Sequence, residues 1–170
     1  MKIIKLTFIS VLTLVFAGFC SSKLKNDVLV EPIAAINEFL PDSVKLIKEN
    51  GEDAIEFCPD NTCELFVAKK EVSEEALKDF FYLYVYFVSD YYVLDEWRKQ
   101  KNSAIIAKTI LSKQKYKNCN EKTNVEKVHC LLEYLAKGDN ISLYDVRYDE
   151  NYRSKEKKEL SEVLKITQAK

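Results

Sequence analysis

The stretch Ser73-EEALKDFFYLYVYF-Val88 decides how this chain folds. Its serine can cap a helix, and Glu74 and Glu75 follow in the first turn, where the helix dipole favours negative charge. Apolar and aromatic residues then recur three and four positions apart and also fill most of the remaining circumference. A helix that is apolar nearly all round is usually buried. We therefore expect a long central helix, and because no Gly or Pro interrupts the sequence, we expect it to extend to Asn102.

The tyrosines of this stretch have two interpretations. Tyr82, Tyr86 and Tyr92 lie on its more polar side and are candidates for binding, since aromatic residues are common in binding sites. The alternative is that they lie at the rim of a core with their hydroxyl groups in water. We favour the core.

Upstream of this helix the hydrophobic period changes from that of a helix to that of a strand. Residues 54–57 alternate, and residues 64–68 form a short run of β-prone side chains. Between them lies Cys58-Pro59-Asp60-Asn61-Thr62-Cys63, whose central residues favour a turn. We expect a β-hairpin with a disulfide across its neck.

Two further features precede the hairpin. Asn50-Gly51 is either a second hairpin turn or the C-terminal cap of a helix through residues 44–48. Pro32 and Pro41 bracket a segment, Ile33 to Leu40, with the pattern of one amphipathic helix.

Downstream of the central helix we expect shorter helices and one strand. Ser103 can cap one helix, and Thr123 and Glu126 have the spacing of a capping box for another, which Gly138 would end. Ile141 to Asp149 alternates as a strand that would pair with the hairpin, and the mixed Lys and Glu residues after Arg153 lead into a short terminal helix. The predicted fold class is α+β: a small antiparallel sheet packed on a long aromatic-rich helix and several shorter helices.

Polar residues of the turn and of the late strand are candidates for binding a partner. They are Asp60, Asn61, Asp145, Arg147 and Asp149. The alternative for the strand residues is an ordinary solvated sheet face whose charges pair with one another.

Five cysteines make an odd number, which needs an explanation if the chain is exported, as its N-terminus predicts below. Setting Cys20 aside leaves four cysteines, for which three pairings are possible. We expect the local pairs Cys58–Cys63 and Cys119–Cys130, because each pair spans an apparent turn. A zinc site that also uses His129 is the alternative, but the spacing meets the usual zinc pattern only marginally. A disulfide at Cys130 would also exclude a catalytic Cys-His pair.

The N-terminus has the layout of a secretory signal peptide. Lys2 and Lys5 precede an uncharged run, Leu6 to Phe19, which is shorter than the roughly 20 residues that span a bilayer. We expect a signal peptide over residues 1–20, a short tether over 21–28 and one globular domain over 29–170. Export into an oxidising compartment would allow the thiols to pair.

Two processing sites are possible. Val15-Phe16-Ala17 fits an ordinary signal peptidase that cleaves before Gly18. Ala17-Gly18-Phe19-Cys20 resembles the lipobox of bacterial lipoproteins, and this resemblance implies that Cys20 is acylated and becomes the mature N-terminus. The protein is then expected in the periplasm or held at a membrane by its lipid, with secretion as the alternative.

Charge and motifs restrict the classes of function that the sequence allows. Loss of the leader removes two of the 26 basic residues against 27 acidic ones, so the formal charge changes from −1 to −3. With no basic stripe apparent, we expect no nucleic-acid partner. No phosphate loop, metal motif or nucleophile elbow is present, so we expect no catalytic residues, metal or cofactor. The leading hypothesis is a protein-binding module of the bacterial envelope, such as an immunity or inhibitor protein. The alternative is a small envelope hydrolase whose site lies near Asp60, Asn61 and the strand through Tyr144, Asp145 and Arg147.

Overall fold

The computed structural model describes residues 30–60, 62–120, 123, 126–127, 129–130, 133, 141–149, 152–160 and 162–163. The expected signal peptide and tether, and with them Cys20, lie outside the described residues. The elements in chain order are α1 (Pro32–Phe39), β1 (Val44–Glu49), β2 (Glu52–Phe57), β3 (Thr62–Ala68), α2 (Glu74–Phe87), α3 (Leu94–Arg98), α4 (Lys101–Leu111), a 3-10 helix (Gln114–Tyr116), α5 (Lys117–Asn120), β4 (Ile141–Asp149) and β5 (Tyr152–Lys158).

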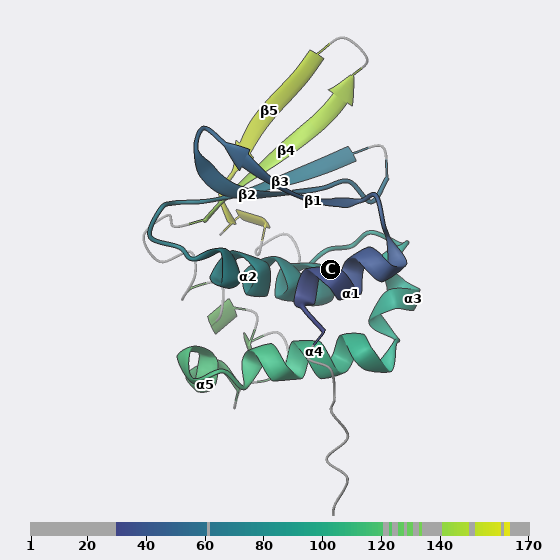
Figure 1. Cartoon of the computed structure of the whole chain (residues 1–170), viewed down its shortest axis with the longest axis vertical. Helices are drawn as coiled ribbons and strands as arrows, with labels where there is room; N and C mark the ends of the chain where they lie inside the picture. The colour runs from purple at the N-terminus through teal and green to yellow at the C-terminus, as the bar shows by residue number, and fades with distance from the viewer. Residues whose placement is uncertain are drawn as a thin grey trace, which may run out of the picture.

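These elements form three layers (Figure 1). An antiparallel sheet in the order β1-β2-β3-β4-β5 covers one side of α1 and α2, and α4 lies on the other side of this helical layer. The predicted α+β class, with a small antiparallel sheet on a central aromatic-rich helix, is confirmed. The segment 32–39 is helical as expected, and strand β4 has the predicted bounds.

Helix α2 is central because it is buried on almost every side. The side-chain oxygen of Ser73 accepts a hydrogen bond from the amide of Ala76 at 3.2 Å, which confirms the predicted cap. Aromatic rings of α2 meet those of the sheet edge to face, as between Phe81 and Phe66 at 5.3 Å between centroids. Such pairs add roughly 1 kcal/mol each to the burial of their apolar area.

The central helix is shorter than the sequence predicted. It ends at Phe87, and the chain turns into α3 and then α4 before Asn102. The guanidinium of Arg98 makes this end possible: Nε donates to the carbonyl oxygens of Val85 and Tyr86 at 3.2 and 3.1 Å, and Nη2 donates to those of Val85 and Ser89. The last carbonyls of a helix need such partners, and a distant arginine cannot be assigned to them from sequence alone.

The sheet has a regular register, which also shows whether Asn50-Gly51 forms a hairpin turn or ends a helix. Residues 44–49 form strand β1, which pairs with β2 from Val44↔Phe57 to Glu49↔Glu52. Asn50 and Gly51 have φ of 55° and 85°, as the type I′ turn of a two-residue hairpin requires. The hairpin alternative is correct, and the helix over 44–48 is wrong.

The central strands β2 and β3 bury side chains on both faces of the sheet. One face packs on α2 through Phe57 and Phe66, while the other carries a smaller buried cluster that includes Leu65 and Val146. This second cluster explains why both alternating positions of β2 and β3 are largely buried.

Two predictions downstream need correction. Strand β5 was missed, because its sequence YRSKEKK is dominated by charge and carries no apolar alternation. Helix α4 begins at Lys101 instead of after Ser103, whose side chain is buried. The serine contributes its backbone instead, since its carbonyl oxygen accepts a hydrogen bond from the hydroxyl of Tyr82 at 3.1 Å.

Both local disulfides are present. Cys58 pairs with Cys63 and Cys119 pairs with Cys130. Glu126 Oε2 accepts hydrogen bonds from the amide and the hydroxyl of Thr123 at 3.0 and 2.7 Å, in keeping with the predicted capping box. Gly138 lies outside the described residues.

Candidate recognition surface

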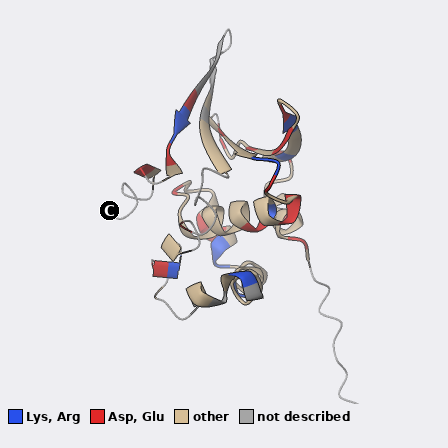
Figure 2. Cartoon of the chain, turned by 90° about the vertical axis from the view of Figure 1, so that its left-hand side faces the viewer, with Lys and Arg blue, Asp and Glu red and all other residues tan. Residues whose placement is uncertain are grey.

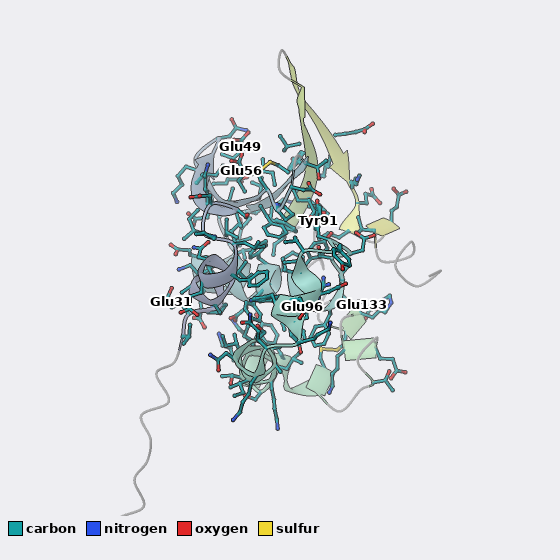
Figure 3. All side chains as sticks on the ribbon, turned by 90° about the vertical axis from the view of Figure 1, so that its right-hand side faces the viewer. Glu31, Glu49, Glu56, Tyr91, Glu96 and Glu133 are labelled. Carbon is teal, nitrogen blue, oxygen red and sulfur yellow. A yellow bond between two sulfur atoms is a disulfide. The ribbon has the colours of Figure 1, made fainter. Side chains whose placement is uncertain are left out.

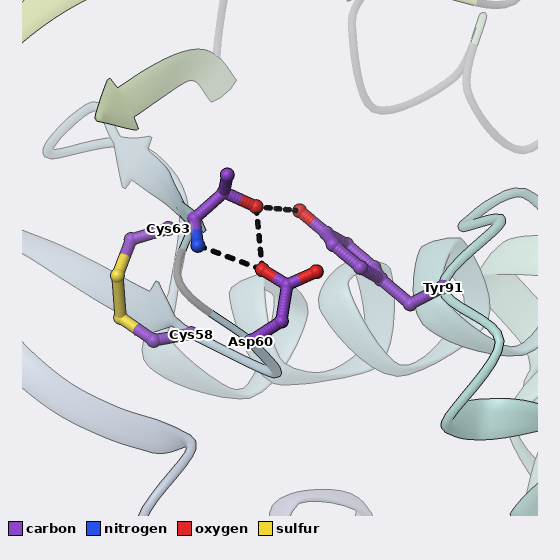
Figure 4. The surroundings of a disulfide bond; sticks show 5 residues. Cys58, Asp60, Cys63 and Tyr91 are labelled. Carbon is purple, nitrogen blue, oxygen red and sulfur yellow. Dashed lines mark hydrogen bonds between the residues drawn. A yellow bond between two sulfur atoms is a disulfide. The ribbon is translucent and has the colours of Figure 1, made fainter. Parts of the chain in front are cut away.

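The turn between β2 and β3 is fixed by a disulfide and by hydrogen bonds within the turn, and we call it the stapled turn (Figure 4). The disulfide Cys58–Cys63 closes it at a Cα–Cα distance of 4.2 Å. Within the turn, Asp60 Oδ1 accepts hydrogen bonds from both the amide and the hydroxyl of Thr62 at 2.7 Å each. This is an Asx turn, in which an aspartate side chain replaces a backbone acceptor. Asp60 is nevertheless exposed to solvent, so the turn presents a carboxylate on a rigid frame.

A second segment is fastened to this turn. The hydroxyl groups of Tyr91 and Thr62 lie 3.4 Å apart, within hydrogen-bond distance. The ring of Tyr91 also packs edge to face on Phe57, with centroids 5.8 Å apart. Figure 3 shows Tyr91 between the sheet and the helical layer. The connection from α2 to α3 is thereby fixed beside the stapled turn.

The next residue, Tyr92, has the opposite environment. Its side chain is 89% exposed, whereas Leu94 two positions later is fully buried. Val93 is also exposed, and Asp90 adds a carboxylate to the same connection. An aromatic side chain held in water on an anchored connection is the kind of residue that partners bury at interfaces. We call Pro59, Asp60, Thr62, Tyr92 and Val93 the recognition surface.

The other two candidate tyrosines belong to the core. Tyr82 is fully buried, and Tyr86 packs against Trp97 with ring centroids 5.9 Å apart. Burial raises the pKa of the Tyr82 hydroxyl above its usual value. Of the three tyrosines proposed from sequence, Tyr82 is buried, Tyr86 is partly buried and Tyr92 is exposed.

The structure brings the turn and the late strand to the same end of the sheet. Thr62 pairs with Arg147 and Glu64 pairs with Asp145 along β3 and β4, so Arg147 lies opposite the turn that carries Asp60. Asp149 lies beyond the end of β3, where it pairs with Tyr152 of β5. For the three β4 residues the structure describes backbone positions only, and Asn61 lies outside the described residues.

One buried carboxylate was not singled out by the sequence. Asp79 on α2 is almost fully buried; its Oδ1 lies 2.7 Å from Lys113 Nζ and its Oδ2 lies 3.3 Å from Lys115 Nζ. Burial opposes the charge of Lys113, but the hydrogen bonds that Lys113 donates to Asp79 and Glu75, together with the negative charges of these carboxylates, outweigh burial and raise the pKa of the lysine. Because two cations satisfy the carboxylate, we interpret the cluster as a brace between α2 and the segment after α4.

Comparison with known proteins adds no relative: no family model, no curated protein and no solved structure matches this chain. Among the described residues, no group of three or more His, Cys, Asp or Glu is placed to hold a metal ion. Within the same part of the chain, every helix is too short or too polar to cross a membrane. The two disulfides indicate an oxidising, exported environment.

Proposed function

We propose that this protein is an exported binding protein of the bacterial envelope, such as an immunity or inhibitor protein, which captures another protein with the recognition surface. The observation that carries the proposal is the exposure of Tyr92, at 89%, on a connection that Tyr91 fastens to a disulfide-stapled turn. A frame that is already ordered loses little conformational entropy on binding, which favours affinity without any reacting group.

Charge supports a particular kind of partner surface. Asp60 in the stapled turn and Asp90, two residues before Tyr92 in the chain, are exposed carboxylates, so we expect a complementary surface that is basic and has a pocket for an aromatic ring. Such complementarity chiefly sets the rate of encounter and the choice of partner, while the buried ring supplies most of the affinity.

We further propose that acylated Cys20 holds the protein at a membrane.

The experiment compares capture from envelope extract by the wild-type protein, by Tyr92→Ala and by a control variant, Leu46→Ala. Leu46 is another exposed hydrophobic residue, on β1, so the control truncates an exposed side chain on a different surface. For the captured partner we expect Tyr92→Ala to cost about 2 kcal/mol, or roughly 30-fold in Kd, and Leu46→Ala to cost nothing measurable.

Asp60 allows charge and shape to be separated. Asp60→Asn retains an oxygen that can accept from Thr62, so it removes charge but not the turn; Asp60→Ala removes both. We expect the asparagine variant to slow association and to lower its salt dependence, and the alanine variant to weaken binding further. Equal capture by all variants, or turnover of an envelope substrate abolished by one polar substitution, would contradict the proposal.

A further inference from the structure

Helix α4 has an exposed face that the proposed function does not use. Ile106, Ala107 and Ile110 bury one side of the helix against the core. On the opposite side, Lys101, Ile105 and Lys108 are exposed, and the side chain of Ile105 is 50% accessible. We call these three residues the α4 face. The layers of Figure 1 place α4 on the far side of the helices from the sheet.

The charge of this region differs from that of the whole chain. Every charged residue from Arg98 to Lys117 is a lysine or an arginine, although the chain as a whole is slightly acidic. Helix α4 itself carries two lysines and no Asp or Glu, and Figure 2 colours such basic residues blue. The expectation that no basic stripe exists therefore does not hold here.

The two lysines of the α4 face are also unpaired within the described residues. Other cations of the basic segment form ion pairs, as Lys99 does with Glu96 at 2.7 Å and Lys113 does with Glu75 at 2.8 Å. Lys101 and Lys108 have no acidic partner in that part of the chain and flank the exposed Ile105. Two free cations around an exposed apolar residue suit a surface that offers phosphate groups above an apolar layer.

The start of the described chain indicates which surface this is. The first described residue, Val30, packs on the core just before α1, and α1 contacts α4. Cys20 precedes it by about ten residues, which reach at most ~35 Å when fully extended. If a lipid on Cys20 enters a membrane, a tether of this length allows α4 to reach that membrane.

We propose that the α4 face contacts the anionic headgroups of the membrane that holds the chain. This proposal depends on the proposed anchoring at Cys20. Two lysines attract anionic lipid only weakly, so the tether supplies the high local concentration and the α4 face supplies the orientation. With α4 toward the membrane, the sheet and its stapled turn point away from it. The recognition surface is then presented to partners.

The test uses the full, acylated chain with Ile105→Trp, bound to phosphatidylcholine vesicles that contain brominated lipid, with and without phosphatidylglycerol. Trp97 is fully buried, so the wild-type protein gives the background quenching. We expect strong quenching of the new tryptophan only when phosphatidylglycerol is present. It should weaken as ionic strength rises from about 0.1 M to 1 M, because the Debye length falls from ~10 to ~3 Å.

Charge reversal provides the matched comparison. Lys101→Glu with Lys108→Glu in the same background should lower the quenching roughly threefold or more. The control, Lys70→Glu with Lys157→Glu, makes the same change of charge at exposed lysines outside α4 and should leave the quenching unchanged.

Three results would overturn the inference. Protein that stays on the vesicles without quenching at position 105 refutes the orientation alone, whereas protein that never associates with vesicles refutes the anchoring as well. An oligonucleotide or an acidic protein that binds the α4 face more tightly than phosphatidylglycerol vesicles do would assign the face to a different partner.

Discussion

The guanidinium of Arg98 lies beneath the last turn of α2, where its Nη2 donates to the carbonyl oxygen of Val85 at 2.9 Å. One side chain thereby satisfies carbonyl groups that the helix leaves without amide partners, and it also fixes α3 against α2. Its half-buried position lowers the pKa of the guanidinium from its usual value, yet the group stays charged at any physiological pH.

Replacing this arginine should therefore cost stability. We expect Arg98→Met to lower the free energy of unfolding by about 2–3 kcal/mol, because buried carbonyls lose a charged donor. Chemical denaturation followed by far-UV circular dichroism measures the change. Lys99→Met is the control, since its side chain is 69% exposed and its ion pair with Glu96 lies in solvent. Equal stability of the two variants would contradict the capping role.

The brace at Asp79 should show its pH dependence at the alkaline end. The pKa of Lys113 in the folded protein is raised above the ordinary value of 10.5, so its contribution is complete below about pH 10.5 and is lost as the pH rises through the folded value. We expect Lys113→Met to be less stable than the wild type at pH 8. The difference should shrink above about pH 10.5. A constant difference from pH 8 to pH 12 would show that Lys113 contributes packing and not charge.

Removing each disulfide should destabilise the protein in proportion to the loop that it closes. The chain-entropy model gives about 2 kcal/mol for Cys58–Cys63 and about 3 kcal/mol for Cys119–Cys130, as measured with double alanine variants. Partner capture should fall further in the first variant than in the second, because only Cys58–Cys63 frames the recognition surface. Non-reducing peptide mapping of exported protein should find the two local pairs, and a crossed pair would be inconsistent with the fold.

Lipidation of Cys20 makes a separate prediction. The intact mass of the mature protein should show an acylated species that begins at Cys20, and Cys20→Ala should release the protein from membranes. A soluble product that begins at Gly18 would show ordinary signal-peptidase cleavage instead.

Local chemistry explains which parts of this fold were predictable. Three features depend on only a few neighbouring residues and were predicted: the Ser73 cap, the β2–β3 turn and the alternation of β4. The end of α2 was not, because its cause is Arg98, far beyond the helix terminus. Strand β5 was missed because its backbone pairs with β4 while its side chains are mostly charged.

In the candidate site, too, features that depend on neighbouring residues were predicted and those that depend on distant contacts were not. Asp60 was selected from turn chemistry and is exposed as a binding residue requires. The contact of Tyr91 with Thr62 joins positions far apart in the chain. The sequence therefore could not show that Tyr91 packs on the turn while Tyr92 is exposed to solvent.

With Cys20 acylated or removed, as the two predicted processing routes require, the other four cysteines pair in their order along the chain, and this bears on how the protein matures. A chain that crosses a membrane from its N-terminus presents Cys58 and Cys63 before Cys119 and Cys130 arrive. An oxidant that joins thiols in their order of appearance then produces only native bonds. Maturation should need an oxidase but no disulfide isomerase, so its yield would depend on the rate of oxidation and not on the correction of errors.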